Sequence, residues 1–308
     1  MLNNELMQTE VPIYLTDGGL ETTLVFLDGY DLPEFAAFPL LENEQGKLRL
    51  RKYYDQYLQI ARQAGTGFVL ETPTWRASTK WGRIIGYRDT DIYTLNMQSV
   101  HLMQELRACH QTDSMPILIS GQIGPQDDGY DPAVQMSVAE ATDYHRHQIM
   151  AFKDAGVDMV SAITMTYPDE AIGICNAAAE LGIPAVISFT VETDGRLPVE
   201  VPLGEAITQV DQSAKTPPAY YMINCAHPDH LHLNRGERWL ERIGGVRANA
   251  SRMSHAELDA SETLDDGDPN EFGLLNQDLR GILPNLRVLG GCCGTDHRHV
   301  GAIAQHCL

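Results

Sequence analysis

The sequence has no apolar run that approaches the roughly 18 to 20 residues needed to cross a bilayer. The opening segment, Met1 to Glu10, is polar and lacks the apolar core of a secretory signal peptide. No phosphate-binding P-loop and no Gly-x-Gly-x-x-Gly after a strand candidate is present, so nothing supports an ATP or dinucleotide site. We therefore expect a soluble, cytoplasmic protein that uses no nucleotide cofactor.

Basic residues are scarce. The 308 residues include 22 Lys and Arg against 42 Asp and Glu, which gives a net charge of −20. Nucleic-acid binding needs basic surface to displace counterions from phosphates, and anionic membranes attract basic segments, so neither partner is expected. The partners predicted from this composition are small molecules, with a homo-oligomer left open.

Cysteines are also few, and they do not form a disulfide framework. Six occur in the chain, at positions 109, 175, 225, 292, 293 and 307. In a reducing compartment such residues are buried thiols, metal ligands or nucleophiles. The adjacent pair Cys292-Cys293 is the unusual feature.

Short β-branched and apolar runs recur along the chain and alternate with stretches of helical length. The eight strand candidates are Val11–Thr16, Gly67–Glu71, Pro116–Ser120, Val157–Ile163, Pro184–Thr190, Ala219–Asn224, Gly245–Ala248 and Arg287–Leu289. This alternation is typical of a parallel sheet with helical crossovers, and eight units predict a (β/α)8 TIM barrel. We expect one α/β domain over residues 1–308; a doubly wound open sheet is the competing fold.

Several helices and one loop can be predicted within this pattern. Apolar residues from Leu50 to Ala61 fall at helical spacing before Gly65, a stop signal. The segments 137–155, 228–243 and 296–306 also read as helices. The acidic, turn-rich stretch 251–277 is expected to be a long loop.

The unusual residues follow the strand candidates. Asp17-Gly18-Gly19 follows the first, Trp75 the second, Cys225 the sixth and Cys292-Cys293 the eighth. A barrel gathers the carboxyl ends of its strands on one face, where active sites are built. These residues are therefore expected to surround one pocket.

Cys225, Cys292 and Cys293 together match a structural zinc site that lacks its fourth ligand. With three thiolates the metal keeps an open position, as catalytic zinc does. The alternative is that these cysteines are ordinary buried thiols. The clustered histidines at positions 227, 230, 232, 297 and 299 are poorly spaced for a shared metal. His227 is the candidate to support the site from behind the ligands.

Five motifs carry a resemblance to a known family. In order they are Asp17-Gly18-Gly19-Leu20-Glu21-Thr22-Thr23-Leu24, Gly121-Gln122-Ile123-Gly124-Pro125, Ser188-Phe189-Thr190-Val191-Glu192, Asn224-Cys225 and Gly290-Gly291-Cys292-Cys293-Gly294-Thr295. The chain resembles the homocysteine S-methyltransferase family over nearly its whole length. The resemblance implies a (β/α)8 barrel in which Cys225, Cys292 and Cys293 bind Zn²⁺ and the substrate thiol takes the open position. It also implies a methyl donor such as S-methylmethionine, S-adenosylmethionine, betaine or methyltetrahydrofolate.

Two positions depart from the family pattern. Ile163 stands where a Glu usually helps to hold the amino group of homocysteine, and Glu21 stands where a smaller residue is usual. We expect the substrates to contact Asp17, Gly18, Glu21, Trp75 and Asn224, with Trp75 as a wall for an onium donor.

These observations predict a zinc-dependent thiol S-methyltransferase that converts homocysteine to methionine. Three alternatives remain: the same chemistry on another thiol, a zinc-dependent hydrolase, and a structural zinc or thiol-binding protein.

Overall fold

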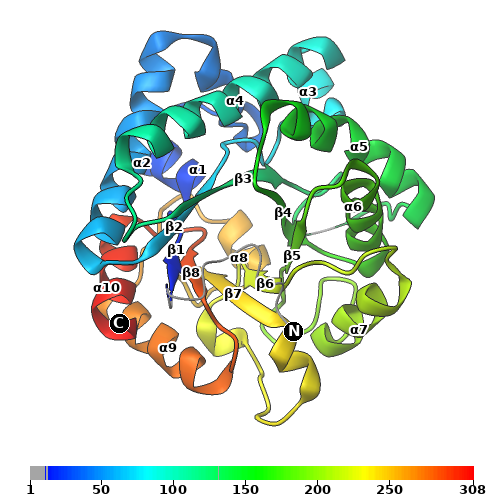
Figure 1. Ribbon diagram of the computed structural model, residues 1–308. Helices are drawn as coiled ribbons and strands as arrows, with labels where there is room; N and C mark the ends of the chain where they lie inside the picture. Colours follow the sequence, from blue (N-terminus) through cyan, green and yellow to red (C-terminus); the bar gives the residue numbers. More distant parts are fainter. Residues whose placement is uncertain (1–10, 12, 131) are drawn as a thin grey trace.

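The eight strands of the computed structural model, which describes residues 11, 13–130 and 132–308, form a closed parallel barrel (Figure 1). They are β1 (Tyr14–Leu15), β2 (Gly67–Glu71), β3 (Ile117–Ile123), β4 (Met159–Met165), β5 (Ala185–Phe189), β6 (Tyr221–Asn224), β7 (Ile243–Ala248) and β8 (Val288–Gly291). Neighbours follow the order of the sequence, and β1 closes the sheet by pairing with β8. The barrel prediction is therefore confirmed, and the doubly wound open sheet, which would have two edge strands, is excluded.

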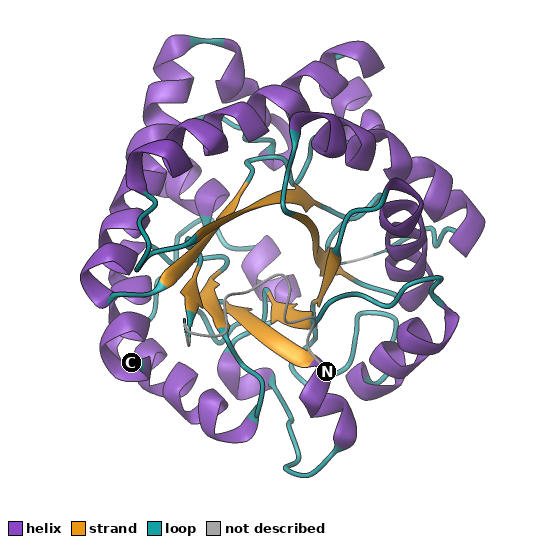
Figure 2. Cartoon of the chain, in the orientation of Figure 1, coloured by secondary structure: helices purple, strands orange, loops and turns teal. Residues whose placement is uncertain are grey.

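Helices surround the barrel (Figure 2). The α-helices are α1 (Leu20–Thr22), α2 (Glu44–Ala64), α3 (Thr79–Ile84), α4 (Asp89–His110), α5 (Val138–Ala155), α6 (Pro168–Leu181), α7 (Leu203–Ser213), α8 (His255–Asp259), α9 (Pro269–Ile282) and α10 (His297–Cys307). A π-helical turn, Thr23–Leu27, continues α1, and short 3-10 helices cover Pro33–Phe35, Phe38–Glu42, Pro228–His230 and Arg238–Arg242. Within the described residues, none of these helices combines the length and apolarity that a membrane span needs.

Caps that can be read in the sequence set the bounds of the main helices. Asn43 accepts a hydrogen bond from the Gly46 amide at the start of α2, and Gly65 ends this helix with φ of 67°. Ser137 and Glu140 form a capping box at the start of α5. The helices predicted around residues 50–61, 137–155 and 296–306 are thus confirmed.

Two local predictions are wrong. The segment 228–243 is no α-helix but two 3-10 helices separated by a turn, in which Gly236 adopts φ of 95°. The segment 251–277 is not all loop, because it contains α8 and the start of α9. The missed signals were a capping box of Ser254 with Glu257 and an Asp268 cap before Pro269.

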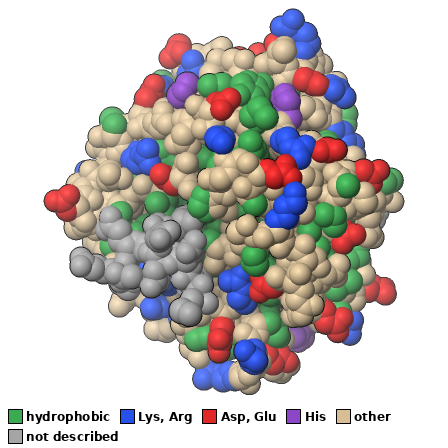
Figure 3. Space-filling model, turned by 45° about the vertical axis from the view of Figure 1, so that its right-hand side comes forward, with side chains coloured by type: hydrophobic (Ala, Val, Ile, Leu, Met, Phe, Trp, Pro, Cys, Tyr) green, Lys and Arg blue, Asp and Glu red, His purple; other side chains and the backbone are tan. Residues whose placement is uncertain are grey.

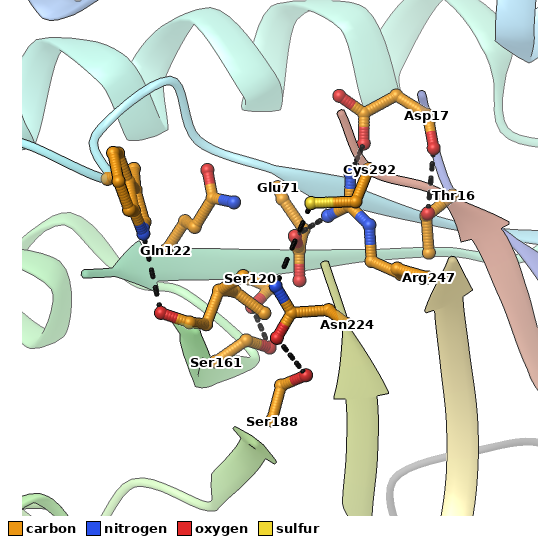
Figure 4. Close-up of polar contacts among 12 residues, drawn as sticks. Thr16, Asp17, Glu71, Ser120, Gln122, Ser161, Ser188, Asn224, Arg247 and Cys292 are labelled. Atoms are coloured by element: carbon orange, nitrogen blue, oxygen red, sulfur yellow. Dashed lines mark hydrogen bonds and ion pairs between the residues drawn. The ribbon is translucent and has the colours of Figure 1, made fainter. Parts of the chain in front are cut away.

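The interior of the barrel changes from apolar to polar towards the carboxyl ends of the strands. Side chains two residues apart on a strand share a face. Val69, Met159, Val186 and Met222 belong to one buried apolar cluster, and Glu71, Ser161, Ser188 and Asn224 follow them two positions later. With Ser120 and Arg247 these four form the polar layer of the barrel, in which the side chains point towards one another (Figure 4). This layer is the floor of the candidate site.

Charged side chains of both signs lie on the surface (Figure 3). On the face seen in Figure 3, Lys and Arg side chains lie dispersed among acidic ones. Among the described residues on that face, they form no continuous basic patch of the kind that binds nucleic acid.

Candidate metal and thiol site

Three cysteines converge at the mouth of the barrel. Cys225 directly follows β6, and Cys292 and Cys293 directly follow β8. The Sγ atoms of Cys225 and Cys293 lie 3.4 Å apart, and all three Sγ atoms lie within 4.8 Å of one another. A tetrahedral zinc ion with Zn–S bonds near 2.3 Å needs S–S separations of about 3.8 Å. Small side-chain movements therefore suffice for three thiolates to bind one ion.

The backbone around the cysteines is held by β7. The Cys225 amide donates to the carbonyl of Arg247 (3.2 Å), and the Cys292 amide donates to that of Ala248 (2.8 Å). Cys225 has φ of 58°, a sparsely populated conformation for a non-glycine residue that is typical of functional sites. β7 thus connects the two cysteine segments, which lie far apart in sequence.

Hydrogen bonds within the cluster lower the pKa of one of its three thiols. The pKa of Cys292 is lowered because the thiols of Cys225 and Cys293 hydrogen-bond to its sulfur, and the positive charge of Arg247 adds to the effect. Even without a metal, the site therefore favours a thiolate at Cys292. This is the protonation state that metal binding requires.

Asn224 positions this cluster from below. Its Oδ1 accepts from the Thr164 amide (2.9 Å), and its Nδ2 donates to Thr164 Oγ1 (2.9 Å). Oδ1 also accepts from the Ser188 hydroxyl (2.6 Å), and Nδ2 donates to Cys292 Sγ (3.7 Å) (Figure 4). Thr164 has φ of 66°. Because the amide is already engaged on both sides, this geometry favours a role in holding Thr164 and Cys292 over direct substrate contact.

The glycines of the first motif allow β1 to approach Cys292. A Cβ on Gly19 would lie 2.6 Å from the carbonyl oxygen of Cys292, and one on Gly18 would lie 2.9 Å from Tyr57 Oη. Real Cβ atoms do not come so close. The carboxylate of Asp17 is therefore placed beside the cysteine cluster by the absence of side chains at the next two positions.

A buried charged triad, which sequence reasoning missed, lies beneath Cys292. Arg247 pairs with Asp17 (Nη2–Oδ1 2.7 Å) and with Glu71, and the exposed fractions of Arg247, Asp17 and Glu71 are only 4%, 4% and 2%. Burial would lower the pKa of Arg247, but the two carboxylates overcome it and raise that pKa. The available signal was a pair of charged residues within apolar strand candidates at their carboxyl ends.

Glu21 adds a further carboxyl group at the rim. It lies half-buried in α1, and its pKa is raised to about 7 by burial, with the negative charges of Asp17 and Cys292 contributing.

Ile163 is buried in the barrel interior. The position predicted to depart from the family pattern therefore holds a buried apolar side chain.

Trp75 lies beside Ile163 and donates its indole N–H to the Ile163 carbonyl (3.3 Å). The guanidinium of Arg76 lies 4.0 Å from the centre of the Trp75 ring, and it also lies over Trp81. One face of Trp75 is thus already occupied by a cation. An onium donor would have to use the other face or the ring edge.

Tyr130 and His255, two residues that sequence reasoning did not single out, cover the other side of the cluster. Tyr130 Oη lies 3.0 Å from Cys225 Sγ, and its ring stacks on His255 with centroids 4.0 Å apart. His255 donates from Nε2 to the Cys225 carbonyl (2.7 Å), and its Nδ1 contacts Glu192 (2.9 Å).

His227 was predicted to support the cysteine site from behind the ligands. In the structure, His255 takes this position instead. His227 instead accepts from the Asp229 amide, and burial lowers its pKa to about 4. No His joins the cysteines in a metal-binding group among the residues that the structure describes.

The comparisons with known proteins agree with this geometry. The family model described as homocysteine S-methyltransferase matches residues 14–307. Crystal structures of the homocysteine methyltransferase MmuM from Escherichia coli share the fold: the metallated form at 19% identity and a TM-score of 0.72, and the oxidized form at 20% and 0.73. Each alignment covers 98 to 99% of both chains. Among curated proteins, none matches the sequence. The family match spans nearly the whole chain, so this protein belongs to the homocysteine S-methyltransferase family and is a methyltransferase.

Proposed function

We propose that this enzyme uses Zn²⁺ to transfer a methyl group from an onium or folate donor to the thiol of homocysteine, which gives methionine. The convergence of the three cysteine sulfurs within 4.8 Å of one another carries the proposal. Thiolates are soft ligands that suit zinc, and three of them leave one position for a substrate. When bound, the ion supplies a lowered thiol pKa, so that the acceptor is held as a nucleophilic thiolate. Family membership favours this reading over a hydrolase or a structural zinc protein.

The chain's own residues would bind and orient the acceptor. An amino-acid thiol carries an ammonium group, and a partly dry pocket must offer it a counter-charge. Ile163 cannot do so. The carboxylate of Asp17 is already paired with Arg247, which leaves Glu21 as the carboxylate for this role. Gly18 lets the backbone approach the acceptor closely, and Asn224 holds Cys292 in place.

An onium donor would bind beside Trp75. Sulfonium and quaternary ammonium groups are attracted to aromatic faces, and Trp75 offers one face that Arg76 does not cover. The side-chain amide of Gln122 points into the mouth from the end of β3, near the polar layer (Figure 4). This amide would orient a polar part of either substrate.

The proposed cellular location and binding partners follow from the chemistry of the cysteines and from the net charge. All six cysteines are free thiols, and a three-thiolate site needs reducing conditions, which supports a cytoplasmic location. The net charge of −20 supports small-molecule partners and disfavours nucleic acid. A homo-oligomer is compatible with the sequence, and light scattering of the purified protein would decide the oligomeric state.

Incubation of the zinc-loaded protein with homocysteine and each donor class, followed by mass spectrometry for methionine, tests the proposal. Methionine should form with at least one donor and should disappear in Cys225→Ser. Cys175→Ser is the matched control, because Cys175 is a buried thiol of α6 within the outer core. If no donor yields methionine while esters or amides are hydrolysed in a manner that needs Cys225, the hydrolase reading replaces this proposal.

A further inference from the structure

Arg247 lies on β7 between the two strands that carry the cysteines. Its carbonyl oxygen accepts from the amide of Cys225, and its guanidinium Nε donates to the carbonyl of Gly291 (3.0 Å), the residue before Cys292. One residue therefore contacts both ligand segments, one through its backbone and one through its side chain.

The rest of the guanidinium extends to two more strands. Nη2 donates to Asp17 Oδ1 (2.7 Å) and to the Gly18 carbonyl (3.2 Å) after β1, and Nη1 pairs with Glu71 at the end of β2 (Figure 4). Tyr53 donates to the second oxygen of Asp17 (3.1 Å). The planar fork of arginine thus fixes the ends of β1, β2 and β8 relative to β7.

Stability alone is a poor reason to keep such a group. Arg247 is buried, with only 4% of the residue exposed. Buried ion pairs cost desolvation that their attraction often fails to recover, and apolar replacements of similar size can be equally stable. A role at the adjacent cysteine site would explain why these three charged side chains are buried there.

The charges around the cysteine site indicate such a role. Three thiolates around a divalent cation leave a net negative centre, and an acceptor thiolate adds another negative charge. Asp17 and Glu71 lie beside this centre and would repel it if they were not neutralised. Arg247 pairs with both carboxylates, through Nη2 to Asp17 and through Nη1 to Glu71.

We infer that Arg247 is a positioning residue, which holds Cys225 and Cys292 at metal-binding separation and screens the thiolates from Asp17 and Glu71. The inference rests on the proposed metal–thiolate function. It separates two contributions of Arg247: the guanidinium fork, which fixes geometry, and the positive charge, which neutralises Asp17 and Glu71 beside the thiolates. Arg247→Met removes both, whereas Arg247→Lys keeps the charge and loses the fork.

Metal affinity and cobalt spectra test the inference without any turnover. Zinc affinity is measured by competition with a chromophoric chelator, and the thiolate-to-metal absorption bands are recorded after Co²⁺ loading. Arg247→Met should weaken zinc binding about 10- to 100-fold, the range found when supporting partners of metal ligands are lost. Arg247→Lys should lose less affinity than Arg247→Met but shift the cobalt bands.

Arg242→Lys is the matched control. Arg242 also forms a guanidinium fork, with Asp211 and the carbonyls of Pro218 and Ala219, but it lies just before β7, at the opposite end of this strand from Arg247. Its variant should keep the wild-type zinc affinity and cobalt bands. Circular dichroism and melting of the metal-free proteins verify that each variant is folded.

Wild-type zinc affinity and wild-type cobalt bands in a folded Arg247→Met variant would overturn the inference. Should that variant fail to fold, the same result in Arg247→Lys would overturn it. Cys225→Ser distinguishes this failure from that of the proposed function. If Cys225→Ser loses zinc while the Arg247 variants do not, only the inference fails; if Cys225→Ser also keeps full zinc, the metal site itself is wrong.

Discussion

Glu21→Gln removes a half-buried carboxyl group whose pKa is raised to about 7 by burial and by the nearby charges of Asp17 and Cys292. The substitution keeps the size of the side chain and removes its charge. In the metal-free folded protein, about half of the Glu21 side chains are ionised near neutral pH, whereas the unfolded chain titrates near 4.5. The variant therefore allows two independent measurements, one of stability and one of acceptor use.

The stability effect has a defined sign. The folded state binds the Glu21 proton more tightly than the unfolded state, so its contribution is present below pH 4.5 and is lost as the pH rises to about 7. At about 1.4 kcal/mol for each pH unit between these two pKa values, the loss is at most about 3 kcal/mol. Urea unfolding of the metal-free protein at pH 5 and pH 8 should show a smaller fall in Glu21→Gln than in wild type. Glu71, whose pKa is also raised to about 7 by burial, keeps its own contribution in both proteins.

The effect on the acceptor has the opposite dependence on pH. Only ionised Glu21 can pair with the ammonium of homocysteine, so the wild-type kcat/KM should rise as the pH increases towards 7. Glu21→Gln should lower kcat/KM for homocysteine by about 1 to 3 kcal/mol, the cost of leaving a buried charge poorly paired. A thiol of equal length without the amine should be little affected.

Equal pH profiles and equal homocysteine kinetics in the two proteins would refute the pairing of Glu21 with the ammonium. A wild-type preference for the amine-free thiol would refute homocysteine as the natural acceptor. Ile163 would then mark a family member with another substrate.

Three further predictions concern the metal and the donor. Elemental analysis should find one zinc per chain in wild type and little in Cys225→Ala, and full occupancy in the variant would contradict the ligand assignment. X-ray absorption of the zinc protein should show three sulfurs and one lighter atom at rest and four sulfurs after a thiol acceptor is added; a shell that no thiol alters would favour a structural or hydrolytic metal. Trp75→Leu should raise the KM of an onium donor more than that of the thiol, because each lost cation–π contact costs about 0.5 to 2 kcal/mol. Equal changes in both KM values would count against a donor wall at Trp75.

Much of the architecture can be predicted from local signals in the sequence. Alternation of short apolar runs with helical stretches located all eight strands, because each run must bury both faces in a parallel sheet. Capping residues such as Asn43 and Ser137 located helix starts for an equally local reason. The convergence of Cys225, Cys292 and Cys293 was also predictable, since a barrel brings the carboxyl ends of β6 and β8 to one face.

The wrongly predicted segments show what local sequence signals cannot predict. The stretch 228–243 has residues compatible with a helix, but Gly236 turns the chain and the segment folds as two 3-10 helices. His227 is adjacent to the cysteine segment in sequence, yet it faces Asp229. His255, 30 residues after Cys225, donates to the Cys225 carbonyl. Neighbours in sequence point in different directions, so adjacency predicts contact poorly.

The composition and order of the residues determined by themselves that this chain forms a barrel with three converging thiols. Only the tertiary structure decided which charges surround them. Arg247 and Glu71 are separated by 176 positions and Arg247 and Asp17 by 230, and neither pairing leaves a periodic or motif signal. Closure of the barrel between β1 and β8 brings these side chains together in a dry interior, where each buried charge must find a partner.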